Sequence, residues 1–277
     1  MRVAAALLTT SWLALTACSK PKNPPVPAPA PSSAATLVAA TADLVVSAEV
    51  EVAGLHVTTG SLAARGPRLT VPPTLWGFSD LSVDLTKLRL EIEPTRGGAP
   101  LSQLLPPGGL AIVNGGYFEA DFRPSTWLKR AGVELSPKTD TSKGGVLAVG
   151  NTGMYLGPFA GLGFDPELAV QSFPLIVEAD GKPGIHTDDG RRAARTVACL
   201  VKSSLHFVVI AAPRGDGPTL FESATLLREP APRGFGCRVA LNLDGGPSTG
   251  VYFSPQVPAK QRLPFANVGY AVAILPR

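Results

Sequence analysis

The segment ALNLDGGPSTGVYF, residues 240–253, is the most informative part of the chain. An alternating apolar and polar strand runs into Asp244, two glycines, a proline and two hydroxyl side chains, and a second apolar strand follows. Every second side chain of a strand lies on the same face, so Leu241 and Leu243 share one face and Asn242 and Asp244 share the other. The segment therefore predicts a buried strand whose polar row ends in a carboxylate at a glycine turn.

A second strand ends in the same way. Residues 110–118, LAIVNGGYF, form a short apolar run that ends in Asn114, Gly115 and Gly116. Taken alone, Asn-Gly and Asp-Gly are strong signals of a hairpin turn. Glycine pairs also let a ligand approach the backbone closely, and they can turn successive N–H groups toward a phosphate. Each segment alone is compatible with either interpretation.

The composition is typical of a folded globular protein. The chain has 277 residues, of which 45% are hydrophobic and 17% are charged. A formal charge of +4, without a block of basic residues, argues against nucleic acid as a partner. The 29 glycines and 28 prolines favour short strands and many turns over long helices.

The N-terminal residues read as a targeting segment. Arg2 precedes a short apolar run, and the following LTAC ends in Cys18, which resembles the cleavage signal of bacterial lipoproteins. We expect residues 1–17 to be a signal peptide and Cys18 to carry the lipid. The alternative is an ordinary secretory signal in which this cysteine is incidental. For a lipoprotein, Ser19 at the next position favours the outer membrane of a Gram-negative bacterium.

Two segments follow the signal. Residues 18–40 are rich in proline and alanine and predict an extended tether in the polyproline II conformation. Residues 41–277 predict one domain. If Cys18 is lipidated, Cys199 and Cys237 are an even pair in an oxidising compartment, which predicts a disulfide. Two buried thiols are the alternative.

The domain reads as α+β, with a mixed, largely antiparallel sheet core and a few packing helices. Period-two patterns and short apolar runs predict strands within residues 44–59, 85–94, 110–118 and 143–150. Residues 195–201 and 205–212 predict an antiparallel pair because only three residues join them. Helices are predicted from Asp165 to Gln171 and over residues 219–229, the second with a capping box of Thr219 and Glu222.

Four segments in order resemble the phosphodiester glycosidase family. They are AIVNGGYF at 111–118, QSFPLIVEADGK at 171–182, RTVACLV at 195–201, and residues 240–253. Pro247, where many members have glycine, and an insert at residues 119–137 depart from the family pattern. The resemblance implies hydrolysis of the bond between the anomeric carbon of a sugar and a phosphate oxygen.

The resemblance also implies roles for particular residues. Asp244 would activate water, act as the nucleophile or stabilise the developing positive charge, Arg195 would bind the phosphate, and Asn114 would orient substrate hydroxyls or the water. Further donors to the phosphate would be Gly115, Gly116, Thr196, Gly245, Gly246, Ser248 and Thr249.

Glycosidases commonly pair two carboxylates, and the candidates for the second are Glu119 and Asp121. No cofactor is implied, and no cluster of histidine and cysteine has metal-ligand spacing. A calcium ion shared by Asp244 and Asp121 is an additional possibility.

The predicted function is an envelope-anchored hydrolase whose partner is a phosphodiester-linked glycan of the cell surface or wall. Membrane contact would come through the N-terminal lipid. The alternative is a lipoprotein that binds glycans or scaffolds the envelope without catalysis. A carboxylate beside a phosphate site favours the enzyme, because like charges repel a ligand that is only bound.

Overall fold

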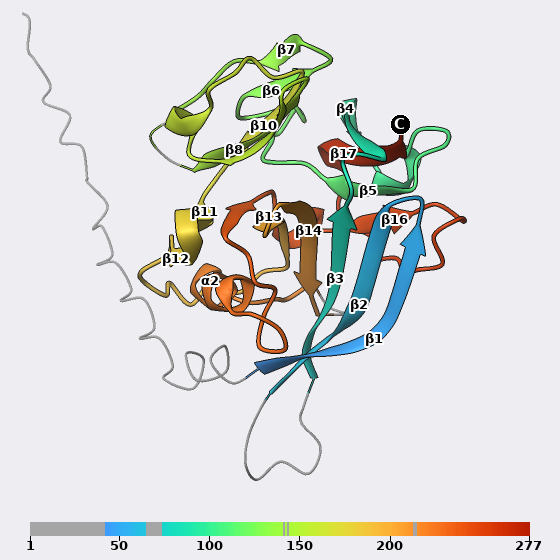
Figure 1. The fold of residues 1–277 in the computed structure, drawn as a ribbon. Helices are drawn as coiled ribbons and strands as arrows, with labels where there is room; N and C mark the ends of the chain where they lie inside the picture. The colour runs from blue at the N-terminus through green and yellow to red at the C-terminus, as the bar shows by residue number, and fades with distance from the viewer. Residues whose placement is uncertain (1–41, 65–73, 141, 143, 213–214) are drawn as a thin grey trace, which may run out of the picture. The chain divides into compact units, whose positions relative to one another are not determined.

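The computed structural model describes residues 42–277 apart from 65–73, 141, 143 and 213–214 (Figure 1). The predicted signal peptide, the lipidation site Cys18 and the tether at 18–40 lie outside the described residues. No helix in the described part of the chain has the length and apolar character that crossing a membrane requires.

Three antiparallel sheets account for the strands of the described chain. The largest has eight strands in the order β1-β2-β3-β14-β13-β15-β11-β12. Its strands are β1 (Ala42–Val52), β2 (Leu55–Ala64), β3 (Thr74–Val83), β11 (Leu175–Glu178), β12 (Lys182–Pro183), β13 (Arg195–Val201), β14 (Ser204–Ala211) and β15 (Val239–Asn242).

The two smaller sheets have five and four strands. The five-stranded sheet has the order β7-β6-β10-β8-β9, with β6 (Leu128–Arg130), β7 (Val133–Ser136), β8 (Gly145–Gly150), β9 (Gly153–Gly157) and β10 (Leu168–Ser172). The four-stranded sheet has the order β16-β5-β17-β4, with β4 (Leu88–Ala99), β5 (Ala111–Asn114), β16 (Val251–Phe253) and β17 (Val268–Pro276). The 119–137 insert that departs from the family pattern supplies β6 and β7.

Short turns explain why strands that are consecutive in sequence pair with each other in the sheets. Ala53 and Gly54 have φ values of 52° and 96°, the left-handed backbone that a two-residue hairpin turn between β1 and β2 requires. The predicted pair at 195–212 is confirmed as β13 and β14, with Val201 opposite Ser204. The prediction of largely antiparallel sheets is therefore confirmed, and the described chain is mostly β-structure.

The only α-helix in the described residues is α2 (Leu220–Arg228). The predicted capping box is present, because the Thr219 hydroxyl accepts from the Glu222 N–H at 3.1 Å and the Glu222 carboxylate accepts from the Thr219 N–H at 2.8 Å. Leu226 and Leu227 of the helix pack on β11, β13 and β14 of the eight-stranded sheet.

The helix predicted from Asp165 to Gln171 is wrong. Residues 168–172 form the strand β10, which pairs with β8 and β6. No helix begins at Asp165. Its carboxylate accepts from Lys129 Nζ at 2.6 Å. Ala169 and Val170 are fully buried as successive residues, which a strand covered on both faces allows. Burial in the sheet outweighed the local Asp-Pro signal.

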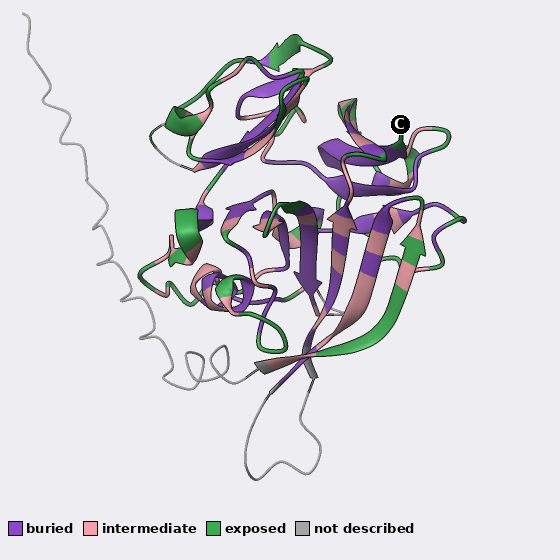
Figure 2. Cartoon of the chain, viewed as in Figure 1, coloured by how far each residue is buried: buried purple, intermediate pink, exposed green. Residues whose placement is uncertain are grey.

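The core follows the alternation of side chains along the strands. On β14, Phe207 and Val209 join a large core built from all three sheets, whereas Val208 and Ile210 face α2. Leu241 and Leu243 join the large core as their period predicts, and Ala240 lies on the opposite face. The edge strand β1 is exposed over residues 45–49 (Figure 2).

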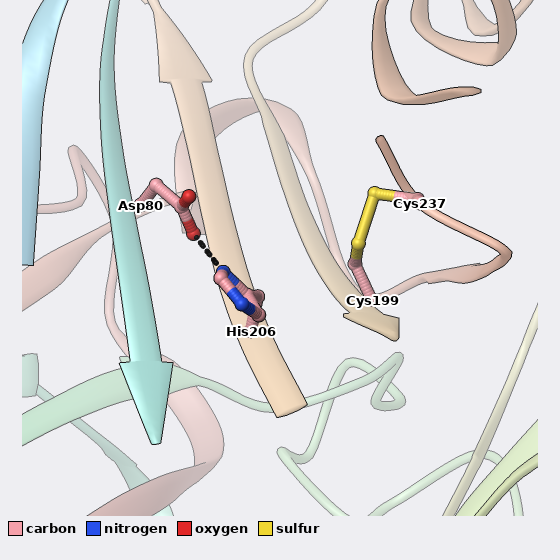
Figure 3. Close-up of a disulfide and its surroundings, with 4 residues drawn as sticks. All are labelled: Asp80, Cys199, His206 and Cys237. Atoms are coloured by element: carbon pink, nitrogen blue, oxygen red, sulfur yellow. Dashed lines mark hydrogen bonds and ion pairs between the residues drawn. A yellow bond between two sulfur atoms is a disulfide. The ribbon is translucent and has the colours of Figure 1, made fainter. Parts of the chain in front are cut away.

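The predicted disulfide between Cys199 and Cys237 is confirmed (Figure 3). It joins β13 to the segment that leads into β15, with 38 residues of sequence separation. Figure 3 also shows His206 of β14 beside Asp80 of β3, with Nδ1 and Oδ1 2.9 Å apart. Both links tie neighbouring strands of the eight-stranded sheet together.

We expect removal of the disulfide to destabilise the protein without removing a group from the site. The variant Cys199→Ala/Cys237→Ala should lose about 2–5 kcal/mol of unfolding free energy, because the reduced chain regains loop entropy when it unfolds. Denaturant unfolding with and without reductant measures the loss. Equal midpoints for the wild type with and without reductant would contradict this expectation.

Candidate active site at the junction of two sheets

The two glycine-doublet segments meet, although their strands belong to different sheets. The backbone N–H of Asp244, after β15, donates to the carbonyl of Gly115, after β5, at 3.1 Å. In return, Asn114 Nδ2 donates to the Asp244 carbonyl at 2.8 Å. The ends of the eight-stranded and four-stranded sheets are therefore joined where the sequence places its polar residues.

Asn114 lies at the centre of this junction and is only 1% exposed. Its Nδ2 also donates to the Gly115 carbonyl at 3.1 Å. Its Oδ1 accepts from Thr196 Oγ1 at 2.6 Å and from the Gly250 N–H at 3.1 Å. These four bonds use the full capacity of the amide. The structure thus favours Asn114 and Thr196 as residues that position the Asp244 turn, in place of the predicted contacts with substrate.

We expect Asn114→Ala to cost about 2–4 kcal/mol of unfolding free energy, because it leaves the Thr196 hydroxyl and the Gly250 N–H buried without a partner. Thermal or denaturant unfolding measures the loss. The matched control is Asn151→Ala at an exposed position after β8. A similar small change in both variants would show that the junction does not depend on the Asn114 amide.

The first glycine doublet is required by packing. A Cβ on Gly115 would lie 2.3 Å from Cε2 of Tyr270, and one on Gly116 would lie 2.6 Å from the Tyr270 hydroxyl oxygen. Tyr270 is fully buried in β17. The space beside this doublet is therefore filled by the tyrosine ring, and the predicted close approach of a ligand is not favoured at Gly115 and Gly116.

The second doublet has open space beside it. Gly246 has a φ of +59°, and a Cβ built there meets no atom within 4 Å. A Cβ on Gly245 would lie 2.9 Å from the Ala194 carbonyl oxygen and 3.9 Å from Arg195 Nη1. The turn after Asp244 therefore lies beside a guanidinium, and its open side is at Gly246.

The Asp244 carboxylate is half-buried at this turn. Burial raises its pKa, and hydrogen bonds from the Ser248 hydroxyl and the Gly245 N–H oppose the increase. The Gly245 bond measures 2.8 Å. Thr249 Oγ1 is buried and has no hydrogen-bond partner in the described structure. Gly245 and Ser248, the predicted donors to the phosphate, donate in this structure to the Asp244 carboxylate.

Arg195 opens β13 and is 8% exposed. Its Nε donates to the Pro218 carbonyl and its Nη2 to the Arg191 carbonyl, both at 3.1 Å. Burial lowers its pKa, and the nearby Tyr117 and Asp189 oppose this decrease. Because two nitrogens are held by backbone carbonyls, the orientation of the guanidinium is fixed, with Nη1 on the side of Gly245.

Tyr117 is a residue of the candidate site for which the sequence patterns predict no role. Its hydroxyl accepts from Asn242 Nδ2 at 2.9 Å. Burial raises its pKa most, the charge of Asp244 raises it further, and Arg195 and the Asn242 bond lower it. The hydroxyl therefore lies within electrostatic range of both charged residues. Since an amide nitrogen only donates, the Tyr117 O–H remains able to donate to another group.

The candidates for a second carboxylate are not part of this junction. Glu119 and Asp121 are exposed, and the Asp121 carboxylate pairs with Arg123. No group of three or more histidine, cysteine, aspartate or glutamate side chains within the described ranges is arranged to hold a metal ion. Tyr117, whose pKa is raised by burial and by the charge of Asp244, is a further group at this junction that could donate a hydrogen bond to a substrate.

A family model matches the part of the chain that forms this junction. Residues 108–275, more than half of the chain, match the model described as phosphodiester glycosidase. The chain belongs to the phosphodiester glycosidase family. The match includes Asn114, Tyr117, Arg195 and Asp244, and the strands β1 to β4 of this family member lie before it. No curated protein sequence matches the chain.

Solved structures share the fold of this phosphodiester glycosidase family member at low sequence identity. The catalytic domain of zebrafish N-acetylglucosamine-1-phosphodiester alpha-N-acetylglucosaminidase, auto-inhibited by its pro-peptide, is 15% identical with a TM-score of 0.59, and 86% of this chain and 89% of that chain are covered. A putative exported protein from Burkholderia pseudomallei is 11% identical with a TM-score of 0.59, covering 91% and 99%. A hypothetical protein from Synechocystis is 13% identical with a TM-score of 0.51, covering 85% and 76%.

Proposed function

We propose that the protein hydrolyses the bond between the anomeric carbon of a sugar and a phosphate oxygen in a phosphodiester-linked glycan of the cell surface or wall. The observation that carries the proposal is the Asp244 carboxylate at an open glycine turn beside the Arg195 guanidinium. Besides burial, both of these charges shift the pKa of the nearby Tyr117 hydroxyl. Membership of the family supports this reaction class.

The chemistry suits the groups present. Water adds its oxygen to the anomeric carbon, the bond from that carbon to the phosphate oxygen breaks, and the products are a free sugar and a phosphomonoester. A phosphate is a good leaving group, so the site needs anion binding more than a strong acid. Arg195 stabilises the departing phosphate, and Asp244 accepts the proton of the attacking water or forms the bond to carbon itself.

Tyr117 supplies the hydrogen bond that the predicted second carboxylate would have supplied. Because its raised pKa keeps the phenol protonated at neutral pH, the O–H can donate to the leaving oxygen. We expect Tyr117→Phe to lower kcat about tenfold, since one hydrogen bond to a developing negative charge is lost.

The ring of the Phe variant can still stack on Phe173, so the fold should be unchanged. Steady-state kinetics with a matched Tyr252→Phe control on β16 measures the effect. Equal kcat values for the two variants would contradict the role of the Tyr117 hydroxyl.

The direct test of the function is release of free sugar from the methyl diester of N-acetylglucosamine-1-phosphate and from the corresponding diesters of other hexoses. Calorimetry with the same diesters measures binding. Turnover of at least one diester supports the proposal. Binding without turnover of any of them would favour a non-catalytic glycan-binding protein.

We further propose that the protein is anchored in the cell envelope through a lipid on Cys18, in the outer membrane of a Gram-negative host. The lipobox-like sequence supports this proposal. A palmitate analogue should label the wild type and not Cys18→Ala. Equal labelling of both chains would exclude the anchor.

A further inference from the structure

We propose that a cavity beside Phe173 binds the sugar on the far side of the phosphate, that is, the acceptor unit of the glycan. The inference rests on the proposed function and adds a second binding subsite to it. The cavity has a volume of about 550 Å³ and lies against the loop between β10 and β11 and the strand β12.

Phe173 is an exposed aromatic ring in direct contact with the site. Its side chain is 45% exposed, and its ring stacks on that of Tyr117 with 4.6 Å between centroids and 26° between planes. The Phe173 carbonyl accepts from Asn242 Nδ2 at 3.3 Å, and the Asn242 N–H donates to the Pro174 carbonyl at 3.0 Å. The same buried asparagine therefore positions the Tyr117 hydroxyl and the backbone that carries the exposed ring.

The lining of the cavity matches the chemistry of a pyranose ring. Phe173, Leu175 and Pro158 supply apolar surface, and Glu178 and Lys182 supply charged groups. A pyranose has an apolar face of C–H groups and a rim of hydroxyls. The apolar face can pack on an aromatic ring, and the hydroxyls can bond to a carboxylate and an ammonium group.

The position of Tyr117 decides which sugar would lie there. The Tyr117 hydroxyl lies within range of both Asp244 and Arg195 and donates to the leaving oxygen in the proposed reaction. Because the leaving oxygen belongs to the phosphate, a group held by Phe173 against the Tyr117 ring fits the leaving side of the broken bond. That group is the acceptor, and the sugar that is released binds at Asp244.

Two diesters of N-acetylglucosamine-1-phosphate test the subsite, one with methanol and one with O6 of methyl α-mannoside. Phe173→Ala should raise KM for the mannoside diester about tenfold more than it raises KM for the methyl diester. Phe173→Trp, which keeps an aromatic ring, should retain the wild-type ratio. The control Val133→Ala removes exposed apolar surface on β7 and should leave both diesters unaffected.

Two kinetic results would overturn the subsite. Equal changes for the two diesters would mean that Phe173 acts only by supporting Tyr117, and no change for either would mean that the ring binds nothing. If the wild type hydrolyses neither diester, the subsite is tested by binding alone. Saturation-transfer NMR with methyl α-mannoside 6-phosphate should then show contact in the wild type that Phe173→Ala loses, and absent or unchanged contact would overturn the subsite.

Discussion

Asp244→Asn should lower kcat about 10³-fold, because the amide neither accepts a proton from water nor attacks the anomeric carbon. KM should change much less, since the shape of the turn is kept. The Asn side chain can accept the Gly245 N–H bond that the carboxylate accepts in the wild type. Sugar release from a sugar-1-phosphodiester under saturating substrate is the measurement.

The same substitution should not destabilise the fold. Burial raises the pKa of Asp244, so the folded state holds this proton more tightly than the unfolded state. The group therefore favours the folded state at pH values below its unfolded pKa, and this contribution is lost as pH rises through the folded pKa. At neutral pH the partly buried charge lowers the free energy of unfolding. Asp244→Asn should therefore have a melting temperature equal to or above that of the wild type.

The control for Asp244→Asn is Asp121→Asn, which makes the same chemical change at an exposed side chain. This variant should keep kcat within about twofold of the wild type, as surface substitutions commonly do. If both variants hydrolyse the diester as fast as the wild type, Asp244 is not a catalytic residue. A large loss of kcat in Asp121→Asn alone would instead identify Asp121, in the insert at residues 119–137, as a catalytic carboxylate.

Arg195→Lys should lower kcat/KM about 10²-fold, the size of effect seen when one preorganised donor is removed from a site of developing negative charge. Lysine keeps the positive charge and loses the planar fork. It also cannot keep both backbone bonds, to Pro218 and Arg191, while presenting a donor toward Gly245. Because the charge is kept, kcat/KM measured across a range of salt concentrations should be lower by a similar factor throughout, which identifies the loss of geometry.

The control for Arg195 is Arg228→Lys, the same exchange at an exposed position in the last turn of α2. Both variants should fold, as judged by circular dichroism and melting temperature. If Arg195→Lys retains full kcat/KM, a point charge is enough at this position and the guanidinium does not orient the phosphate. A loss of the same size in Arg228→Lys would indicate a general effect on stability.

Local patterns predict the strands of this protein well, because each strand carries its own periodicity. The hairpin of β13 and β14 and the capped helix α2 follow from residues that lie next to one another in sequence. At residues 165–171 the local pattern predicts the wrong element. An Asp-Pro start is a local helix signal, and pairing of β10 with two distant strands overrides it.

The site is predicted less completely than the fold. The motifs identify Asp244 and Arg195, and the structure places them beside the same turn. They do not reveal that the Asn114 amide is saturated by partners that include two distant segments, β13 and residues 240–253. Nor do they distinguish Tyr117 from an ordinary core aromatic, because its role depends on Asn242, 125 residues later in the chain. Such roles arise from tertiary contacts that leave no periodic trace in sequence.

The saturated amide of Asn114 has an evolutionary consequence. Aspartate lacks the two N–H donors of asparagine, and glutamine is longer by one methylene. Neither of these two similar amino acids can therefore form all four hydrogen bonds of Asn114. We therefore expect few substitutions of Asn114 to be tolerated. The exposed side chain of Phe173 is not held by a comparable set of hydrogen bonds. Substitutions at the proposed acceptor subsite could therefore change the preferred sugar without altering the junction between the two sheets.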